Sequence, residues 1–282
     1  MATAVQTSTA VELFLPQFVV FGRGALDRVG ERTRPYGRRA LVVTDRGMVA
    51  TGLVRRVTDA LGSAGIEAIV FDEVEPNPTI AQVEAGIGAG AGRSVDVLLS
   101  IGGGSAHDCA KMIALVAANG GEVQEYEGAD RSPGPGLPLV AVNTTSGTGA
   151  DVSRFAVITD TKRHVKMVIA DRRVMPAVAI NDPLTTTGMP KAVTMASGLD
   201  ALTHAVEAYV STAATDFTDL LSLRAVELVH RNLHRAIEHG DDLDAREGMM
   251  LGSLYAGLAI NSALVGAAHA LAHALGALLD LP

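Results

Sequence analysis

The chain has 282 residues, of which 48% are hydrophobic and 19% charged, and it contains no tryptophan. This length and composition indicate a globular protein of one large or two ordinary domains. The formal net charge of −8 argues against a general affinity for nucleic acid or for an anionic membrane surface, because both attract basic proteins.

No targeting or membrane segment is predicted. The first 17 residues carry no basic residue ahead of their short apolar stretch, which is not typical of a signal peptide. The apolar run at 263–279 is broken by two histidines, so it predicts a buried helix rather than a membrane span. The single cysteine, Cys109, excludes an internal disulfide framework. We therefore expect a cytoplasmic protein with no membrane partner.

The first part of the chain alternates short Val/Ile/Leu-rich runs with helical patterns. Helical patterns fall at 52–65, at 107–120 and directly after the PNPT motif at 76–79. The strand runs do not alternate polar and apolar residues, which is typical of a parallel sheet covered by helices. Two further β-rich runs around a charged turn at 160–164 predict a hairpin. The predicted buried strands are 38–45, 66–74, 95–104, 137–145 and 174–182.

From residue 183 onward the sequence predicts helices only. Thr187 followed by Pro190 predicts a helix start. The segment NLHRAIEHGDDLD, at 232–244, predicts a break between two long helices. We therefore expect a nucleotide-binding α/β domain at 1–182 and an all-helical domain at 183–282.

The motif SIGGGSAHDCAK lies between a predicted strand and a predicted helix. Glycine lets the backbone approach a ligand, and a helix N-terminus favours an anion. The N–H groups of Gly102, Gly103, Gly104 and Ser105 are therefore predicted to hold a pyrophosphate, although a tight turn without a ligand would give the same pattern. The motif is neither G-x-G-x-x-G nor Walker A, so a standard Rossmann domain is not expected.

The ends of two other predicted strands offer contacts to the same ligand. Asp45 ends the first strand, where a carboxylate can accept hydrogen bonds from an adenosine ribose and would favour NAD over NADP. Its alternative role is to cap the next helix. Thr144, Thr145 and Thr148 follow the fourth strand and could line the same crevice. A polar loop without a ligand is the alternative for that segment.

Two pairs of residues in the helical part have the spacing of neighbours on one helix face. The pairs are Asp200 with His204, and His269 with His273. A carboxylate together with imidazoles suits Fe²⁺, Zn²⁺ or Mn²⁺. Each pair alone also fits a structural role, but together they predict one metal site with four candidate ligands.

These motifs, in this order, resemble the signatures of the iron-containing (group III) alcohol dehydrogenase family. The strings that carry the likeness are GGGSAHDCAK, NTTSGTGADVSRFAVITD, GLDALTHAVEAYVS and HALAHALGA. The likeness runs from about Leu13 to Pro282 and is greatest to the branch acting on short primary alcohols and diols, including NAD-dependent methanol dehydrogenases and lactaldehyde reductases. It implies a dehydroquinate-synthase-like α/β nucleotide-binding domain, an all-α metal and substrate domain, and a homodimer or larger homo-oligomer.

The resemblance also implies roles for individual residues. It makes Asp200, His204 and His269 the metal ligands, for Fe²⁺ with Zn²⁺ or Mn²⁺ as alternatives. It moves His273 from the ligand set to a place beside the nicotinamide and a small alcohol or aldehyde substrate, where it would relay the hydroxyl proton. Further contacts to NAD are implied at Asp45, at the glycine loop, and at Asp108, Thr144, Thr145 and Lys166. From the residues alone, Lys166 would be an ordinary solvated lysine.

The sequence departs from the family pattern in several places. Ala106, Ser146 and Asp151 stand where the family often has Pro, Ala and Glu. Family members carry a fourth metal ligand in a Pro-His-Gly stretch after the H-x-x-x-H helix, whereas this sequence ends at Pro282. We therefore expect a sequence that is truncated relative to the family. The alternatives are a catalytically impaired, nucleotide-binding fragment and a dehydroquinate-synthase-like enzyme that uses zinc and NAD.

Overall fold

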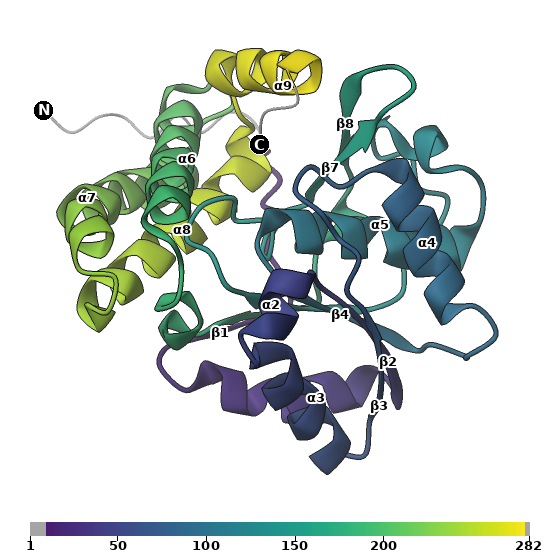
Figure 1. Ribbon diagram of the computed structural model, residues 1–282. Coiled ribbons are helices and arrows are strands. Elements are labelled where there is room, and N and C mark those ends of the chain that lie inside the picture. The colour runs from purple at the N-terminus through teal and green to yellow at the C-terminus, as the bar shows by residue number, and fades with distance from the viewer. Residues whose placement is uncertain (1–9, 280–282) are drawn as a thin grey trace, which may run out of the picture.

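A six-stranded, all-parallel sheet forms the centre of the first part of the chain (Figure 1). The computed structural model describes residues 10–279. The strand order is β1-β9-β6-β4-β2-β3. In chain order, the strands are β1 (Phe18–Phe21), β2 (Arg39–Val43), β3 (Glu67–Phe71), β4 (Val97–Gly102), β6 (Leu139–Asn143) and β9 (Val178–Asn181).

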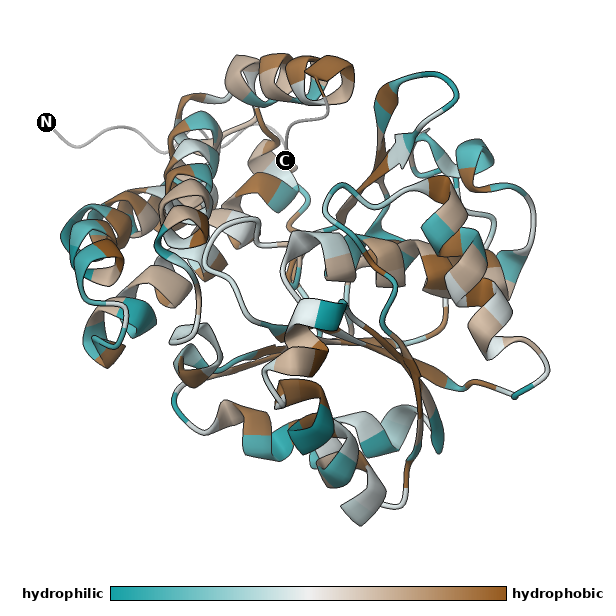
Figure 2. Ribbon diagram, viewed as in Figure 1, coloured by the Kyte–Doolittle hydropathy of each residue, from teal (hydrophilic) through white to brown (hydrophobic). Residues whose placement is uncertain are grey.

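Helices cover both faces of this sheet, which explains why its central strands are largely apolar (Figure 2). In β2, Leu41 and Val43 pack on the face covered by α4 (Ile80–Gly90) and α5 (Gly104–Asn119). Successive side chains of a strand point to opposite faces. Ala40 and Val42 therefore pack on the other face, against α1 (Val29–Thr33) and α3 (Leu53–Ser63).

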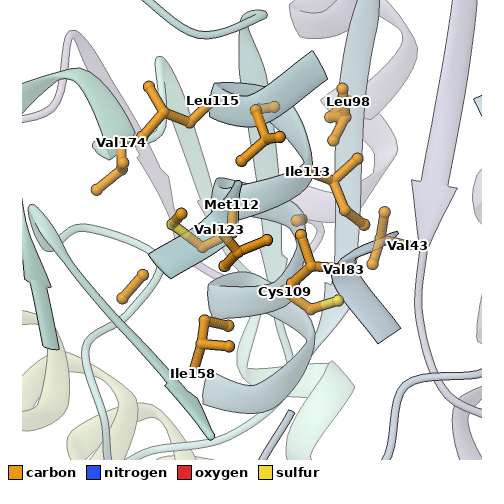
Figure 3. Packing of buried hydrophobic residues seen from close by; sticks show 14 of the residues in the cluster. Val43, Val83, Leu98, Cys109, Met112, Ile113, Leu115, Val123, Ile158 and Val174 are labelled. Carbon is orange, nitrogen blue, oxygen red and sulfur yellow. The ribbon is translucent and has the colours of Figure 1, made fainter. Parts of the chain in front are cut away.

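Helix α5 is central to the larger of these two cores. Figure 3 shows its apolar side chains lying among residues of the sheet, of α4 and of β7 (Phe155–Asp160). This packing holds the N-terminal end of α5 at the carboxyl edge of the sheet, directly after β4. The labelled side chains include Cys109, Met112, Ile113 and Leu115 from α5, with Val43, Val83, Leu98 and Ile158 around them.

A second, three-stranded sheet lies beside the first. It has the order β5-β8-β7, with β5 at Gly128–Ala129 and β8 at Val165–Ala170. Strands β7 and β8 pair antiparallel, so the predicted hairpin is confirmed. Within its turn, the Asp160 carboxylate accepts hydrogen bonds from the backbone N–H groups of Lys162 and Arg163.

Every described element after η5 (Pro183–Thr186) is an α-helix. Helix α6 (Lys191–Val210) begins directly after Pro190, as predicted. Helix α7 (Asp216–Glu238) ends and α8 (Leu243–Ala263) begins inside the predicted break. These three helices pack on one another, and α9 (Ala267–Leu279) lies beside β8 (Figure 1). The prediction of a buried helix at 263–279 is wrong for α9, where Gly276 alone among the described residues is buried.

The predicted α/β part followed by an all-helical part is thus confirmed. The division into domains at residue 182 stays a prediction. The strand β1, the short helix α2 (Arg46–Ala50) and the two-residue strand β5 were not predicted. Within residues 10–279 no single helix is long and apolar enough to cross a membrane; α8 and α9 together pass that test on length and composition, but a bend of 99° separates them.

Candidate functional site

A cleft of about 1380 Å³ opens along the carboxyl edge of the six-stranded sheet and reaches α6 and α9. Segments that directly follow β2, β3, β4 and β6 form one wall. This is where open α/β sheets bind their ligands. The predicted site residues that line it are Asp45, Gly103, Gly104, Ser105, Thr145, Thr148, Lys166, Asp200, His269 and His273.

The glycine motif and the threonine-rich loop meet in this cleft. A Cβ atom on Gly103 would lie 2.8 Å from Cγ2 of Thr145, and one on Gly104 would lie 2.8 Å from Cγ2 of Thr148. Glycine is therefore required at both positions for the two loops to approach this closely. Helix α5 begins at Gly104 without a side-chain cap, so its first N–H groups are available to an anionic ligand.

The structure places Asp45 both at the cleft and at the start of α2. Its Oδ1 accepts a hydrogen bond from the backbone N–H of Met48 at 2.9 Å, which is the capping role that the sequence left open. The carboxylate also lines the cleft. A carboxylate has two oxygens and several acceptor positions, so capping leaves room for a hydrogen bond from a ligand hydroxyl.

Three of the predicted cofactor contacts are not among the residues that line the cleft: Gly102, Asp108 and Thr144. Asp108 lies on the side of α5 that faces β7, where Oδ2 accepts from the backbone N–H of Val157 at 3.0 Å and Oδ1 lies 3.7 Å from Nζ of Lys111. Burial raises the pKa of Asp108 to about 6, against the opposing effect of Lys111. These contacts make Asp108 an anchor between α5 and β7.

Lys166 is placed differently from the solvated lysine that its sequence context suggested. It projects from β8 into the lining of the cleft. Its Nζ donates to Oδ1 of Asn77 at 2.8 Å. The PNPT motif is therefore tied to the hairpin, and a cationic group is held at the cleft wall.

The three predicted metal ligands come together although they lie on two helices. The ligand atoms of Asp200, His204 and His269 all lie within 4.8 Å of one another. Oδ1 of Asp200 is 3.4 Å from Nε2 of His269 and 3.8 Å from Nε2 of His204. The two imidazole rings are stacked, with centroids 4.4 Å apart and planes inclined by 15°. One carboxylate oxygen and two imidazole nitrogens form a donor set that suits Fe²⁺, Zn²⁺ or Mn²⁺.

The electrostatics of this cluster also suit a cation. Burial opposes ionisation of Asp200, but the neighbouring histidines outweigh it and lower the pKa of this carboxyl group. Burial lowers the pKa of His204, more than the Asp200 carboxylate raises it. For His269 burial is outweighed by two carboxylates, those of Asp200 and Glu207, which raise its pKa. The ionised form of the Asp200 carboxylate and the neutral form of the His204 imidazole are thus both favoured in this cluster.

His273 lines the cleft but does not belong to the ligand cluster. Its ring meets that of His269 edge to face, with the centroids 6.1 Å apart. The four-ligand set predicted from spacing alone is therefore not assembled in the structure. The cluster contains the three residues that the family resemblance implies as metal ligands, and His273 stands next to it. Their role as metal ligands stays a prediction.

Glu207 was missed by the sequence analysis. It is 8% exposed, and its Oε2 lies 2.5 Å from Nδ1 of His269. The signal that could have found it is spacing: it follows His204 by three residues and therefore lies on the same face of α6 as Asp200 and His204.

Comparison with known proteins gives the family. The protein-family model described as iron-containing alcohol dehydrogenase matches residues 16–183. The family model for the C-terminal part of the same family matches residues 194–282. Alcohol dehydrogenase 4 of Schizosaccharomyces pombe is 44% identical over 282 residues, which are 100% of this chain and 67% of that protein. The NAD-dependent methanol dehydrogenase of Bacillus methanolicus is 41% identical over 95% of this chain and 71% of its own length.

Solved structures agree with this assignment. A crystal structure of 1,3-propanediol oxidoreductase has a TM-score of 0.94 and 44% identity, and the match covers 97% of this chain and 72% of that one. Sulfoacetaldehyde reductase of Bifidobacterium kashiwanohense in complex with NAD⁺ has a TM-score of 0.90 and 28% identity, covering 98% of this chain and 73% of that one. The chain therefore belongs to the iron-containing alcohol dehydrogenase family, whose members are oxidoreductases acting on alcohols.

Proposed function

We propose that this protein interconverts a small primary alcohol or diol and its aldehyde by hydride transfer, using NAD and a divalent metal. The observation that carries the proposal is the cluster of Asp200, His204 and His269, which adjoins the same cleft as the glycine loop. Relatives named for alcohol, propanediol and methanol oxidation support the substrate class. The family match favours this function over a dehydroquinate-synthase-like one.

The metal is proposed to be Fe²⁺, with Zn²⁺ or Mn²⁺ as alternatives. Asp200, His204 and His269 would hold it, since their ligand atoms converge within 4.8 Å. Both imidazoles turn Nε2 towards the Asp200 carboxylate, so three donors already point to one place. The ligand types do not decide among the three metals, and the family name supports iron.

NAD is the proposed cofactor. The first N–H groups of α5 and the loop at Gly103 and Gly104 would hold its pyrophosphate. Asp45 would accept hydrogen bonds from the adenosine ribose, and its negative charge would disfavour the 2′-phosphate of NADP. The complex of the sulfoacetaldehyde reductase with NAD⁺ supports this choice.

The chemistry is divided between the bound groups and the protein. When bound, the metal supplies a Lewis acid for the alcohol oxygen, and NAD supplies the acceptor for the hydride. The protein positions both groups and excludes alternative geometries. His273 lines the cleft beside His269, and we assign to its ring the relay of the hydroxyl proton towards solvent.

The test is formation of NADH from NAD and 1-propanol or 1,3-propanediol, with protein loaded anaerobically with Fe²⁺, Zn²⁺ or Mn²⁺. We expect turnover, and we expect His204→Ala to lower kcat/KM roughly 100-fold or more, because several kcal/mol of transition-state stabilisation depend on the metal. The matched control is His234→Ala, which removes an exposed histidine of α7. Binding of NADH without turnover under any of the three metals would contradict the proposal and favour a catalytically impaired fragment.

We also propose a cytoplasmic homodimer or larger homo-oligomer. The single, buried Cys109 is compatible with a reducing compartment. The edge strand β1 exposes Phe18 and Val19 (44% and 39%), a feature that a partner subunit would cover. Light scattering after size exclusion measures the oligomeric state. Cell fractionation measures the localisation.

A further inference from the structure

Glu207 joins the two helices that supply the metal ligands. It belongs to α6, and both of its carboxylate oxygens contact the first turn of α9. Oε1 accepts a hydrogen bond from the backbone N–H of Ala268 at 2.7 Å, and Oε2 lies 2.5 Å from Nδ1 of His269. The two oxygens thus contact neighbouring residues of α9, one through the backbone and one through the side chain.

The contact to His269 determines which ring nitrogen carries hydrogen. An ionised carboxylate can only accept a hydrogen bond, so Nδ1 of His269 must be the donor. In a neutral imidazole the other nitrogen, Nε2, then has its lone pair free. Nε2 is the atom that faces Asp200, at 3.4 Å. Glu207 therefore presents His269 in the tautomer and the orientation that a metal ion requires.

The contact to Ala268 fixes the position of the helix itself. Apolar packing contributes little to that position, because Gly276 is the only buried residue among the described residues of α9. Leu271, Leu275 and Leu278 are each more than half exposed. A Cβ atom on Gly266 would lie 3.0 Å from Oε1 of Glu207, so the chain reaches the carboxylate closely just before α9 begins. The carboxylate also complements the positive end of the helix dipole.

We propose that Glu207 is a positioning residue of the metal site: it holds His269 with Nε2 directed at the ligand cluster and fixes α9 against α6. The inference rests on the proposed metal site and deepens it. Metal-binding histidines commonly donate their second N–H to a carboxylate, and loss of such a partner typically costs about 10- to 100-fold in metal affinity. We expect loss of the Glu207 carboxylate to lower metal affinity by a factor within this range.

The informative variant is Glu207→Gln. The amide oxygen can still accept from Ala268, so the start of α9 keeps its cap. The amide nitrogen only donates, and opposite Nδ1 of His269 it would force the ring hydrogen onto Nε2. We therefore expect Glu207→Gln to weaken Zn²⁺ binding about 10- to 100-fold, while the melting temperature of the metal-free protein stays near that of the wild type. Glu207→Asp keeps an acceptor-only group and should bind Zn²⁺ more tightly than Glu207→Gln.

Affinity is measured by competition with a fluorescent zinc chelator, which requires no turnover. The control is Asp242→Asn, the same change at the carboxylate that caps α8 through the N–H of Ala245; it should leave Zn²⁺ affinity unchanged. In a His269→Ala background, Glu207→Gln should cause no further loss, since the two residues act as a unit.

Different outcomes overturn different statements. A wild-type protein that binds no metal would overturn the proposed function and this inference with it. A wild-type protein that binds Zn²⁺ while Glu207→Gln binds it equally well would overturn the inference alone. The inference would also be overturned if Glu207→Gln lowered the melting temperature of the metal-free protein and still weakened binding in the His269→Ala background, since the role of Glu207 would then be structural.

Discussion

His107 is a buried residue of α5 whose ionisation should affect the stability of the whole chain. It has no exposed surface, and its Nδ1 lies 2.7 Å from Oγ of Ser100. Burial, together with the nearby ammonium group of Lys111, lowers the pKa of His107 to about 3 from an ordinary value of 6.5. The folded protein therefore keeps this ring neutral in conditions where the unfolded chain would protonate it.

This difference predicts a pH dependence with a definite sign. Between pH 6.5 and about pH 3 the unfolded state binds one proton that the folded state does not bind, so His107 makes the free energy of unfolding fall as the pH falls through this window. Its contribution to the slope approaches about 1.4 kcal/mol per pH unit. We expect His107→Gln to show a shallower decline between pH 6.5 and pH 4.5, measured by urea unfolding.

The two proteins are compared by the slope of the free energy of unfolding against pH, because His107→Gln can also change stability at neutral pH. His234→Gln, at an exposed position of α7, is the control for replacing a histidine. Parallel pH profiles for His107→Gln and the wild type would show that this ring does not titrate differently on unfolding.

At the level of single residues, the sequence predicted neighbours on one helix and the meeting of two such pairs at one site, but not the individual contacts between the helices. The four-residue spacing placed Asp200 beside His204 and His269 beside His273, but it could not show which member of the second pair approaches the first. The contact of Glu207 with His269 joins residues 62 apart in the chain, so no local pattern reveals it. Asp108 shows a related limit, since the motif does not reveal which side of α5 faces β7.

Two elements of the fold approach each other backbone to backbone. The loop after β6 meets α8 where a Cβ atom on Gly149 would lie 2.5 Å from Cα of Gly257. A Cβ atom on Gly257 would in turn lie 2.8 Å from Cα of Gly149. Gly149 also has a φ of +60°, a conformation that favours glycine. The loop that carries Thr145 and Thr148 is thus held directly against the helical part of the molecule.

This contact predicts that Gly257→Ala destabilises the protein although alanine is the better helix former. The added methyl group must move the loop or the helix, which typically costs about 1–3 kcal/mol in a close-packed interior. Chemical denaturation measures the loss, and weaker NADH binding should accompany it because the loop lines the cleft. Gly88→Ala, in α4 with nothing within 4 Å of its Cβ position, should instead stabilise by up to about 1 kcal/mol. Equal effects of the two substitutions would contradict the packing argument.

The elements that the sequence predicted well are those buried on both faces of the sheet, since burial on both sides produces the continuous apolar runs of β2, β4 and β6. Strand β1 escaped prediction because it has four residues and lies at the edge, where it pairs with β9 alone. The helix α2 has five residues, none of them buried. Short, exposed elements leave too little hydrophobic pattern to be recognised.

At the scale of the whole molecule, the cleft is bounded by the parallel sheet, the hairpin and the helices α6 and α9. A ligand in this cleft binds the folded state and not the unfolded chain, so it stabilises the entire molecule. At a concentration 100 times its Kd, NADH should raise the free energy of unfolding by about 2.7 kcal/mol. Thermal unfolding is measured with NADH, with Zn²⁺ and with both ligands present. The shifts give the contribution of each ligand to the stability of the protein.

The variant that separates these contributions is His204→Ala. We expect it to lose the stabilisation by Zn²⁺ and to keep the stabilisation by NADH, because His204 belongs to the ligand cluster and the nucleotide would be held by the loop before α5. Loss of both effects would indicate a general disruption of the cleft rather than loss of a metal ligand.

The arrangement of the ligands on α6 and α9 also has a consequence for how the protein is made. A growing chain presents Asp200 and His204 well before His269, which follows Glu207 by 62 residues. Two donors hold an ion poorly, and the third is brought to them only when α9 is in place beside α6. If the proposed site binds a metal, the ion would therefore be loaded only after α9 has packed beside α6. An occupied site would then mark a molecule in which these two helices have already come together.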